Sequence, residues 1–486
     1  MSIETSTLRP LAAAALALFL GACAVGPDFA RPETPVAEHF TNADASAPLA
    51  TTAGDAEFWR TLGDPELDAL VERTLAANQD LRAALARYDA AQALSRGSRY
   101  DRYPTVTAHA GASASRLSAD QAPGSTRGER DDVQSYDVGA SLGWELDFFG
   151  RVRREIESRD ADAQALAEDL RTLQVAIAAE VARTYVGLRG FQEQLEVARR
   201  NAGTQAETLH LVETGLAAGR GTEFDTARAR AQLETTSARI PALEAEIAVA
   251  RHRLAVLAGE QPGTNDAALE AARSLPALPP TIDPGTPGEL LRRRPDIAGA
   301  EARLHAATAR VGVATADLYP RFTLSGLLGT QAAERTALFG ADSESGFVAL
   351  GVDWSFLDTG RVRARIAASD ALSEEKLAQY RQTVLRALEE TENALVRYGK
   401  ARIEDEHLAR AADDGTRAAA LARTRYEAGA GTLLEVLDAE RVQLQAQDAL
   451  AGGRTRTLAG LIEVYRAVAG GWPSRAPLAA HSPGSR

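Results

Sequence analysis

The sequence predicts a mixed α and β fold in which one structural unit occurs twice. Two observations carry this prediction: several motifs recur after a constant interval, and in each copy alternating apolar and polar residues precede long stretches with helical spacing. Of the 486 residues, 45% are hydrophobic and 25% are charged, which suffices for a large core. The formal net charge is -13, so the composition gives no indication of a nucleic-acid partner.

The amino terminus has the pattern of an export signal. Residues 11–20 form an apolar stretch after Arg9 that is too short to span a bilayer but has the length of a signal-peptide core. The stretch ends in Leu-Gly-Ala-Cys, which resembles the bacterial lipobox, so residues 1–22 are expected to be cleaved and Cys23 to carry covalent lipid. Ala24 is not the aspartate that retains many lipoproteins on the inner membrane, which favours the outer membrane. An ordinary signal peptide with a chance cysteine is the alternative.

The internal repeat is visible in motifs that recur at a constant interval. Trp144 recurs as Trp354, and the Gly-Arg-Val-Arg segment at 150–153 recurs at 360–363 with the same offset, called here the tryptophan offset. Upstream, Tyr103-Pro104 recurs as Tyr319-Pro320 with a slightly longer offset, the tyrosine offset. The copies therefore differ in the length of a loop before the tryptophan. Each copy is expected to contain a helix, two strands, a long helix, a tight turn and a further helix.

The strands are expected between Pro104 and Phe148 and between Pro320 and Phe356. In the second and fourth strands, apolar side chains alternate with small or polar ones, so one face is apolar and the other is polar and suited to contact with water. His109 lies at an odd-numbered position of the first strand and is interpreted as a polar residue on the polar face. Spans of at least about ten residues, aromatic residues near the ends and the export signal together favour a membrane β-barrel.

Four strands cannot close such a barrel, because an open edge in lipid leaves backbone groups without hydrogen-bond partners. Neighbouring chains must therefore complete it, and three chains would supply twelve strands, the smallest cyclic solution larger than a dimer. The strand count alone also allows other stoichiometries. After the strands, apolar residues step by three or four positions between Leu166 and Leu195, as in a coiled-coil seam. A helix over 151–214 would be about 95 Å long at about 1.5 Å per residue, and its many alanines suit close packing around a hollow tube.

These features resemble the TolC-like outer-membrane efflux proteins, in particular the lipidated multidrug and nodulation-type branch. The residues that carry the resemblance are Cys23 with Gly26-Pro27-Asp28-Phe29, Phe58-Trp59 with Asp64-Pro65-Glu66-Leu67, and Leu290-Leu291-Arg292-Arg293-Arg294-Pro295-Asp296-Ile297 before Ala300-Glu301. The resemblance implies a homotrimer in which a 12-stranded outer-membrane β-barrel continues into a 12-helix periplasmic α-barrel. It also implies a passive exit channel of a tripartite efflux system. An inner-membrane proton-driven pump and a periplasmic adaptor would deliver drugs or other toxic small molecules to it.

The expected division of the chain follows from the repeat and the resemblance. It comprises a lipoprotein signal peptide at 1–22, an acylated N-terminus and equatorial segment at 23–75, a first repeat at 76–258, a linker and equatorial segment at 259–288, a second repeat at 289–472 and a disordered tail at 473–486.

Each long helix reverses at a glycine-rich tip. The tips are formed by Gly219, Arg220, Gly221 and Thr222 and by Gly429, Ala430, Gly431 and Thr432. Glycine suits the positive backbone angle that such a reversal requires. The resemblance implies that the tips dock a periplasmic adaptor, whereas a turn that only reverses the chain is the alternative. Arg220 departs from the apolar residue often found at its position.

The resemblance also implies a gate beside the tips. Asp225 and Tyr426 occupy positions that hold the tip helices closed, whereas a basic residue of that network is replaced by Gly431. Its substitute is expected among Arg228, Arg423 and Arg425. Glu435 and Asp438 lie three residues apart on one helix face, and symmetry would make them a ring that selects cations. A solvated helix face is the alternative.

No catalytic constellation, phosphate loop or metal-ligand spacing is evident, so no enzymatic activity, metal or cofactor is expected beyond the lipid on Cys23. That single cysteine excludes an intramolecular disulfide framework. Three alternatives remain: an outer-membrane channel for type I protein secretion, a metal-ion exit duct, and a non-pore periplasmic coiled-coil lipoprotein scaffold. Since Met1 is the only methionine, a thioether copper relay is excluded.

Overall fold

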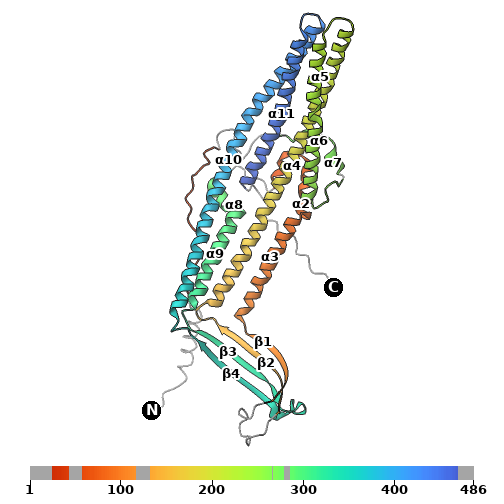
Figure 1. Cartoon of the computed structure of the whole chain (residues 1–486). Helices are drawn as coiled ribbons and strands as arrows, with labels where there is room; N and C mark the ends of the chain where they lie inside the picture. The colour runs from red at the N-terminus through yellow and green to blue at the C-terminus, as the bar shows by residue number, and fades with distance from the viewer. Residues whose placement is uncertain (1–23, 43–56, 117–131, 265, 279–284, 469–486) are drawn as a thin grey trace. The chain divides into compact units, whose positions relative to one another are not determined.

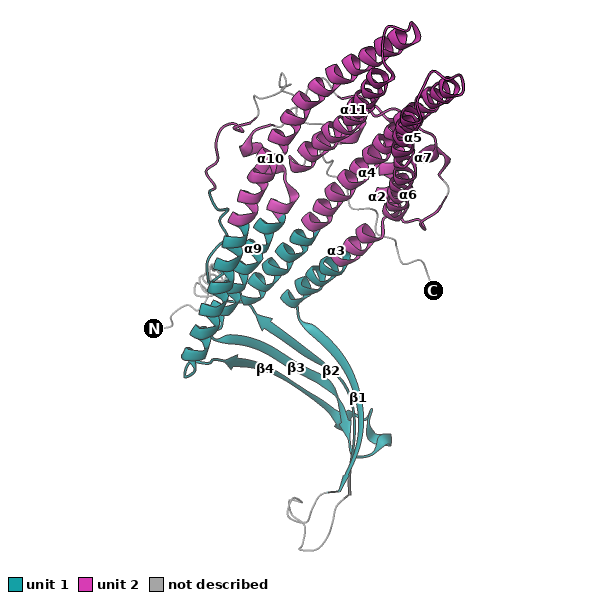
Figure 2. Ribbon diagram, turned by 45° about the horizontal axis from the view of Figure 1, so that its top comes forward, with its two compact units in different colours: residues 1–33, 88–166, 299–380 teal, residues 34–87, 167–298, 381–486 magenta. Residues whose placement is uncertain are grey.

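The structure is a computed structural model that describes residues 24–42, 57–116, 132–264, 266–278 and 285–468. The predicted signal peptide, Cys23 and the predicted tail lie outside these residues. The chain divides into two compact units (Figure 2): unit 1 contains residues 1–33, 88–166 and 299–380, and unit 2 contains residues 34–87, 167–298 and 381–486. None of the described helices combines the length and the apolar character that crossing a membrane requires.

Unit 1 contains a four-stranded antiparallel sheet in the order β1-β2-β3-β4 (Figure 1). The strands are β1 (Thr105–Arg116), β2 (Asp132–Leu146), β3 (Arg321–Ala332) and β4 (Glu344–Asp353). Unit 1 also holds the short 3-10 helices η3 (Arg99–Arg102), η4 (Arg335–Ala337) and η5 (Ala341–Ser343). The mixed α and β prediction is therefore confirmed, and β1 and β4 are the two edges of the described sheet.

The two hairpins follow the sequence repeat residue by residue. Thr105 of β1 pairs with Gly143 of β2, and Arg321 of β3 pairs with Asp353 of β4. Thr105 and Arg321 are separated by the tyrosine offset, and Gly143 and Asp353 by the tryptophan offset. The repeat therefore extends to the hydrogen-bond register of the strands.

Four helices run from one unit into the other along the chain. They are α3 (Gln79–Ser98), α4 (Arg151–Ala217), α9 (Pro295–Ala316) and α10 (Thr359–Glu427). The remaining helices belong to unit 2: η2 (Phe58–Leu62), α2 (Pro65–Ala77), α5 (Glu223–Ser237), α6 (Arg239–Leu257), α7 (Ala267–Glu270), α8 (Pro287–Arg293) and α11 (Leu433–Ala467). Each long helix, α4 and α10, thus precedes a turn and a returning helix.

The returning helix of the first repeat differs from the single helix that the pattern predicts. It is divided at Ala238 into α5 and α6, whereas α11 continues without a break. The reason is Pro241, which has no N–H to donate to the carbonyl of Ser237 and whose ring crowds that carbonyl. The second repeat has Ala451 at the corresponding position and keeps its helix.

The core of unit 2 forms where the segment before α2 packs on α4. Trp59, Leu67 and Tyr185 are almost completely buried. The Tyr185 hydroxyl donates to Asp64, the N-cap of α2, at 2.6 Å. The fully buried Arg189 guanidinium contacts Glu66 at 2.9 Å and donates to the carbonyls of Ala271 and Ala268. These contacts join the start of α2, the middle of α4 and the segment around α7.

In unit 1 the residues that follow Cys23 pack against the start of α4. The Val25 amide donates to the Phe149 carbonyl at 3.0 Å, and Asp28 accepts from the Arg154 guanidinium. The Phe29 ring stacks on His305 of α9 at a centroid distance of 4.5 Å. The described N-terminal segment is therefore held at the junction between β2 and α4.

Candidate functional site

The two glycine-rich tips of unit 2 have the same backbone geometry. Gly219 and Gly429 have φ values of 74° and 71°, in the left-handed region that favours glycine. The Arg220 amide donates to the Gly215 carbonyl at 2.9 Å, and the Ala430 amide donates to the Arg425 carbonyl at 2.8 Å. This pattern is the Schellman motif, which satisfies carbonyls at the end of a helix. The turn geometry thus explains one glycine in each tip.

A capping box starts the helix that follows each tip. Thr222 caps α5 and exchanges hydrogen bonds with Asp225, and Thr432 caps α11 and exchanges hydrogen bonds with Glu435. Asp225, predicted for the gate, and Glu435, predicted for the cation-selecting ring, are thus equivalent positions of the two repeats with the same local role. The spacing Thr-x-x-Asp or Thr-x-x-Glu before a helix could have revealed this role in the sequence.

A cavity of about 450 Å³ lies between the tips and brings Asp225 and Tyr426 together. Both residues line it, one from the first repeat and one from the second. The exposed ring of Phe224 and the side chains of Arg220 and Arg228 also line the cavity. The predicted gate pair is thus assembled within one chain, beside Arg220 of the first tip.

The two acidic residues predicted to select cations are exposed near the start of α11. The Asp438 carboxylate accepts from Arg441 at 2.6 Å, and the Glu435 carboxylate lies 4.0 Å from Arg425. Their side chains are 56% and 47% exposed. Arginines of the same chain therefore partly offset the charge of this acidic face, and solvent screens what remains.

Gly431 occupies a position where a side chain would be crowded. A Cβ atom there would come within 3.2 Å of the Cβ of Arg425 and of the backbone nitrogen of Tyr426. Such approaches are closer than ordinary van der Waals contact. The turn therefore leaves little room for the basic residue that the resemblance leads one to expect here.

Of the three candidate substitutes, Arg423 makes contacts between helices. Its guanidinium lies on α10 and donates to Glu440 of α11 at 3.0 Å and to the Thr208 hydroxyl of α4 at 3.0 Å. Arg425 donates to the Ala430 carbonyl within its own tip at 3.2 Å. Arg228 lines the cavity between the tips. Arg423 alone of these three is bonded to two other helices within the described residues.

Glu440 is the buried acid of this cluster. Its side chain is 5% exposed, and its Oε1 atom accepts from Arg423 at 3.0 Å and from Thr208 at 3.1 Å. The buried Oε2 atom has no hydrogen-bond partner within the described residues. Burial raises the pKa of Glu440, although the bonds from Thr208 and Arg423 oppose this shift. Sequence reasoning missed Glu440, yet a charged residue in helical register with buried Val436, Leu437 and Leu444 was a visible signal.

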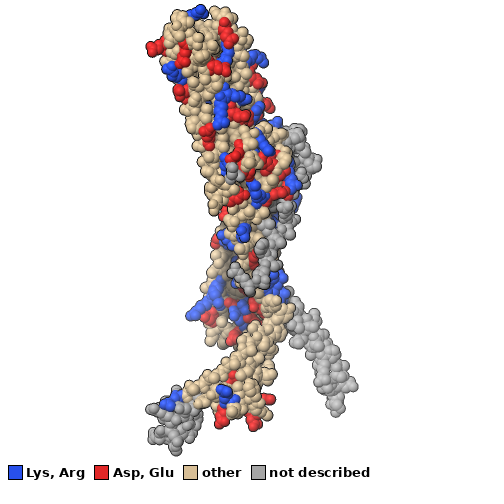
Figure 3. Space-filling view, turned by 90° about the vertical axis from the view of Figure 1, so that its right-hand side faces the viewer, with Lys and Arg blue, Asp and Glu red and all other residues tan. Residues whose placement is uncertain are grey.

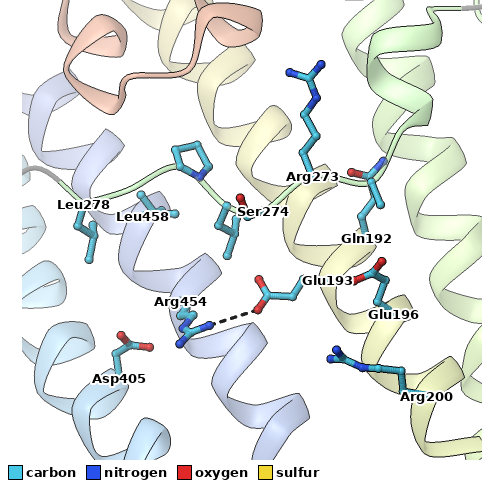
Figure 4. Close-up of a pocket in the computed structure, with 13 residues that line it drawn as sticks. Gln192, Glu193, Glu196, Arg200, Arg273, Ser274, Leu278, Asp405, Arg454 and Leu458 are labelled. Carbon is cyan, nitrogen blue, oxygen red and sulfur yellow. Dashed lines mark hydrogen bonds and ion pairs between the residues drawn. The ribbon is translucent and has the colours of Figure 1, made fainter.

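A second cavity in unit 2, of about 510 Å³, is lined by charges of both signs (Figure 4). Glu193 of α4 and Arg454 of α11 form an ion pair at 3.4 Å across it. Asp405 of α10 also lines the cavity, and burial raises its pKa. Within the described residues no group of three or more His, Cys, Asp or Glu side chains could hold a metal ion. This cavity was not predicted from the sequence.

Comparisons with known proteins agree with this geometry. Residues 70–260 and 286–470 match the model of the family "Outer membrane efflux protein". Outer membrane protein OprJ of Pseudomonas aeruginosa is 34% identical over 96% of this chain and 97% of its own length. The toluene efflux pump outer membrane protein TtgI of Pseudomonas putida is 30% identical over 94% of this chain and 97% of its own length.

A solved structure extends the likeness to the fold. The outer-membrane channel OprN has a TM-score of 0.87 and 42% sequence identity to this chain. The match covers 93% of this chain and all of the OprN chain. The predicted TolC-like fold of the chain and its outer-membrane location are therefore confirmed. This chain belongs to the outer membrane efflux protein family.

Proposed function

We propose that three copies of this chain form a passive channel through which small molecules leave across the outer membrane. The observation that carries the proposal is the sheet of unit 1, whose edge strands β1 and β4 have no further partner strand among the described residues. In lipid every backbone polar group needs a partner, so the edges must be covered by strands of other copies. Three copies supply twelve strands, within the range of outer-membrane barrels.

The side chains of the sheet support a lipid-facing surface. Val348, Leu350 and Val352 alternate along β4 and are 81%, 63% and 56% exposed. Arg321, Asp353 and Asp137 occupy the other set of alternating positions of the paired strands. On the face shown in Figure 3, the sheet carries few charged side chains, whereas the helices carry many of both signs. An apolar outer face and a polar inner face are typical of a membrane barrel.

Partners and cargo are proposed from the relatives. TtgI belongs to a toluene efflux pump, which favours small apolar or toxic molecules as cargo over whole proteins. This is the reason to prefer efflux to type I protein secretion. A periplasmic adaptor at the tips and an inner-membrane proton-driven pump would deliver the cargo. The channel itself would have no enzymatic activity and no cofactor.

The gate would open by an iris-like movement of the tip helices. Asp225 and Tyr426 line one cavity, and Arg423 joins three helices beside it. Hydrogen bonds that involve a charged group contribute about 1.5 to 3 kcal/mol each, which an adaptor could offset by binding the open state more tightly. The closed state would therefore be held by a few hydrogen bonds between helices, which can break one after another.

The lipid on Cys23 would anchor the chain at the membrane. The packing of residues 24–29 supports this anchor. These residues contact the start of α4, which follows directly after strand β2 of the sheet. The described residues next to that cysteine are thus held where β2 ends and α4 begins. Each buried methylene would contribute about 0.8 kcal/mol to membrane attachment.

The proposal is tested with protein purified from membranes in detergent. A heat-modifiable trimer that conducts ions in planar bilayers is the expected result. A protein that is released from membranes without detergent, runs as a monomer and does not conduct would contradict it. That outcome would favour the non-pore scaffold.

A further inference from the structure

The internal repeat allows the contact between copies to be deduced residue by residue. Positions in β1 and α3 of the first repeat correspond to β3 and α9 of the second by the tyrosine offset, which relates Tyr103 to Tyr319. Positions in β2 and α4 correspond to β4 and α10 by the tryptophan offset, which relates Trp144 to Trp354. The strand registers of the two hairpins obey these offsets without exception. The two repeats are therefore structurally equivalent at the level of single residues.

The strands β2 and β3 show how one repeat joins the next. In the pairing of β2 with β3, Trp144 lies opposite Leu324 and Ser141 lies opposite Leu327. In a closed ring of equivalent repeats, β4 must meet the following β1 as β2 meets β3. Adding the tryptophan offset to a β2 position gives its counterpart in β4, and subtracting the tyrosine offset from a β3 position gives its counterpart in β1. Applied to the pairing of β2 with β3, these two steps give the pairing of β4 with the following β1.

We propose that β4 of one copy pairs with β1 of the next in the register that places Trp354, the residue directly after β4, opposite Ala108 of the partner subunit. This inference rests on the proposed trimer and specifies its seam. The same register places Ala349 opposite Ser113 and Phe347 opposite Ser115 of the partner subunit. All the positions so paired have the same parity as their counterparts in β2 and β3, so the apolar and polar faces remain continuous across the seam.

Polar side chains also meet at the seam in this register. Asp353, at the end of β4, lies opposite His109 of the partner subunit. Within one chain, His109 already lies 3.8 Å from Asp137, and its side chain is 38% exposed. The seam would therefore place a second carboxylate beside the same imidazole on the polar face.

The helices that follow the strands give an independent check. Within one chain, Arg310 of α9 forms an ion pair with Asp162 of α4. By the tyrosine offset, Arg310 corresponds to Leu94 of α3, and by the tryptophan offset, Asp162 corresponds to Leu372 of α10. At the seam these two leucines belong to different copies. Both leucines are exposed in the single chain, by 64% and 56%. The position that holds an ion pair within one chain thus holds a contact between two leucines at the seam. This contact would bury two apolar side chains that are exposed in the single chain.

Four single substitutions test the register. Ser113→Cys and Ser115→Cys lie on β1, and Phe347→Cys and Ala349→Cys lie on β4, so they combine into four double variants. Facing side chains on paired strands have Cβ atoms about 5 Å apart, whereas diagonal neighbours are about 7 to 8 Å apart, too far for a disulfide. Cys23, the only natural cysteine, is present in all four variants alike.

The expected result is specific to two of the four variants. After mild oxidation in membranes, Ser113→Cys/Ala349→Cys and Ser115→Cys/Phe347→Cys should give covalent trimers on a denaturing gel. The slipped pairs, Ser113→Cys/Phe347→Cys and Ser115→Cys/Ala349→Cys, should remain monomers after boiling. Every substituted position occurs once in each class, so local reactivity cannot produce this difference.

The outcomes separate this inference from the proposed function. Preferential cross-linking of a slipped pair, or no cross-linking of any pair in a conducting, heat-modifiable trimer, would overturn the register and leave the channel standing. Monomers that neither cross-link nor conduct would overturn both. The wild-type protein, oxidised in parallel, shows whether trimers form without engineered cysteines.

Discussion

Replacing Arg423 with methionine should loosen the three helices that meet below the tips. Methionine retains an apolar stem but removes the donor to Glu440 and Thr208. Glu440 is 5% exposed, so it would be left as a buried carboxylate without its cation. Removing one partner of a buried ion pair costs about 3 to 5 kcal/mol. Because Arg423 itself is 31% exposed and water can replace part of it, we expect about 3 kcal/mol.

Hydrogen–deuterium exchange measures this loss where it occurs. The backbone amides of residues 204–212 on α4 and 436–444 on α11 report the local opening of these helices. A loss of about 3 kcal/mol corresponds to exchange roughly 100-fold faster at these amides. Amides of α2, which lie in another part of unit 2, should keep their exchange rates and serve as the internal control.

The double variant Arg423→Met/Glu440→Gln provides the matched control. Glutamine keeps the size of the side chain and can accept from Thr208, but it leaves no buried charge. Exchange should therefore return to within about tenfold of the wild-type rate. If Arg423→Met left exchange unchanged, or if adding Glu440→Gln gave no rescue, the cluster of Arg423, Glu440 and Thr208 would not stabilise the packing of α4, α10 and α11.

The effect should also depend on pH. Burial raises the pKa of Glu440 in the folded protein, so the folded state binds a proton more readily than the unfolded chain does. The contribution of this group to stability is therefore greatest below the unfolded pKa and falls as the pH rises through the folded value. Removing Arg423 takes away a group that lowers this pKa. The penalty of Arg423→Met should consequently be smaller at about pH 5 than at about pH 7.5.

Three further predictions concern the gate, the acidic face and the anchor. Asp225→Asn with Tyr426→Phe should raise single-channel conductance in planar bilayers several-fold, because it removes a hydroxyl and a charge from the cavity between the tips. Glu435→Gln with Asp438→Asn should shift the reversal potential in a salt gradient toward lower cation preference. Cys23→Ser should abolish incorporation of radiolabelled palmitate while the protein still forms heat-modifiable trimers, because strands rather than lipid close the barrel.

Each of these predictions has its own control and contradiction. Thr222→Ala loosens the cap of α5 but leaves the Asp225 carboxylate in place, so it should not alter conductance as the gate variant does. Unchanged conductance in the gate variant would remove the gate assignment. Arg441→Gln should increase cation preference, since it frees the carboxylate of Asp438. Persistent palmitate labelling of Cys23→Ser would place the lipid elsewhere.

Strands and repeats were predictable because their signals are periodic. The alternation over β2 and β4 and the two constant offsets follow from the geometry of a pleated strand and from the equivalence of the halves. The break between α5 and α6 could have been predicted from Pro241, whose effect is local. Such features depend on neighbours in sequence and need no knowledge of the packing.

The polar cluster of Arg423, Glu440 and Thr208 was harder to predict. The partners are 17 and 215 residues apart from the arginine, and nothing in their local sequence pairs them. Arg423 is one of three arginines near the tips that fit the sequence prediction, and only the packing of α4, α10 and α11 distinguishes it. The likeness to a family supplied Asp225 and Tyr426 as a pair. It could not indicate which residue takes over from the basic residue that Gly431 replaces.

The two oxygens of Asp225 differ in their hydrogen bonds, and this difference bears on the proposed gate. Its Oδ2 atom accepts from both the backbone and the hydroxyl of Thr222, at 3.1 and 2.6 Å. Within the described residues, Oδ1 is therefore the oxygen left for a partner across the cavity. In the proposed gate, a bond from Tyr426 to Oδ1 would break without disturbing the start of α5, whereas a bond to Oδ2 would compete with the cap. In the proposed iris-like opening, the tip helices would thus separate while each keeps its own first turn.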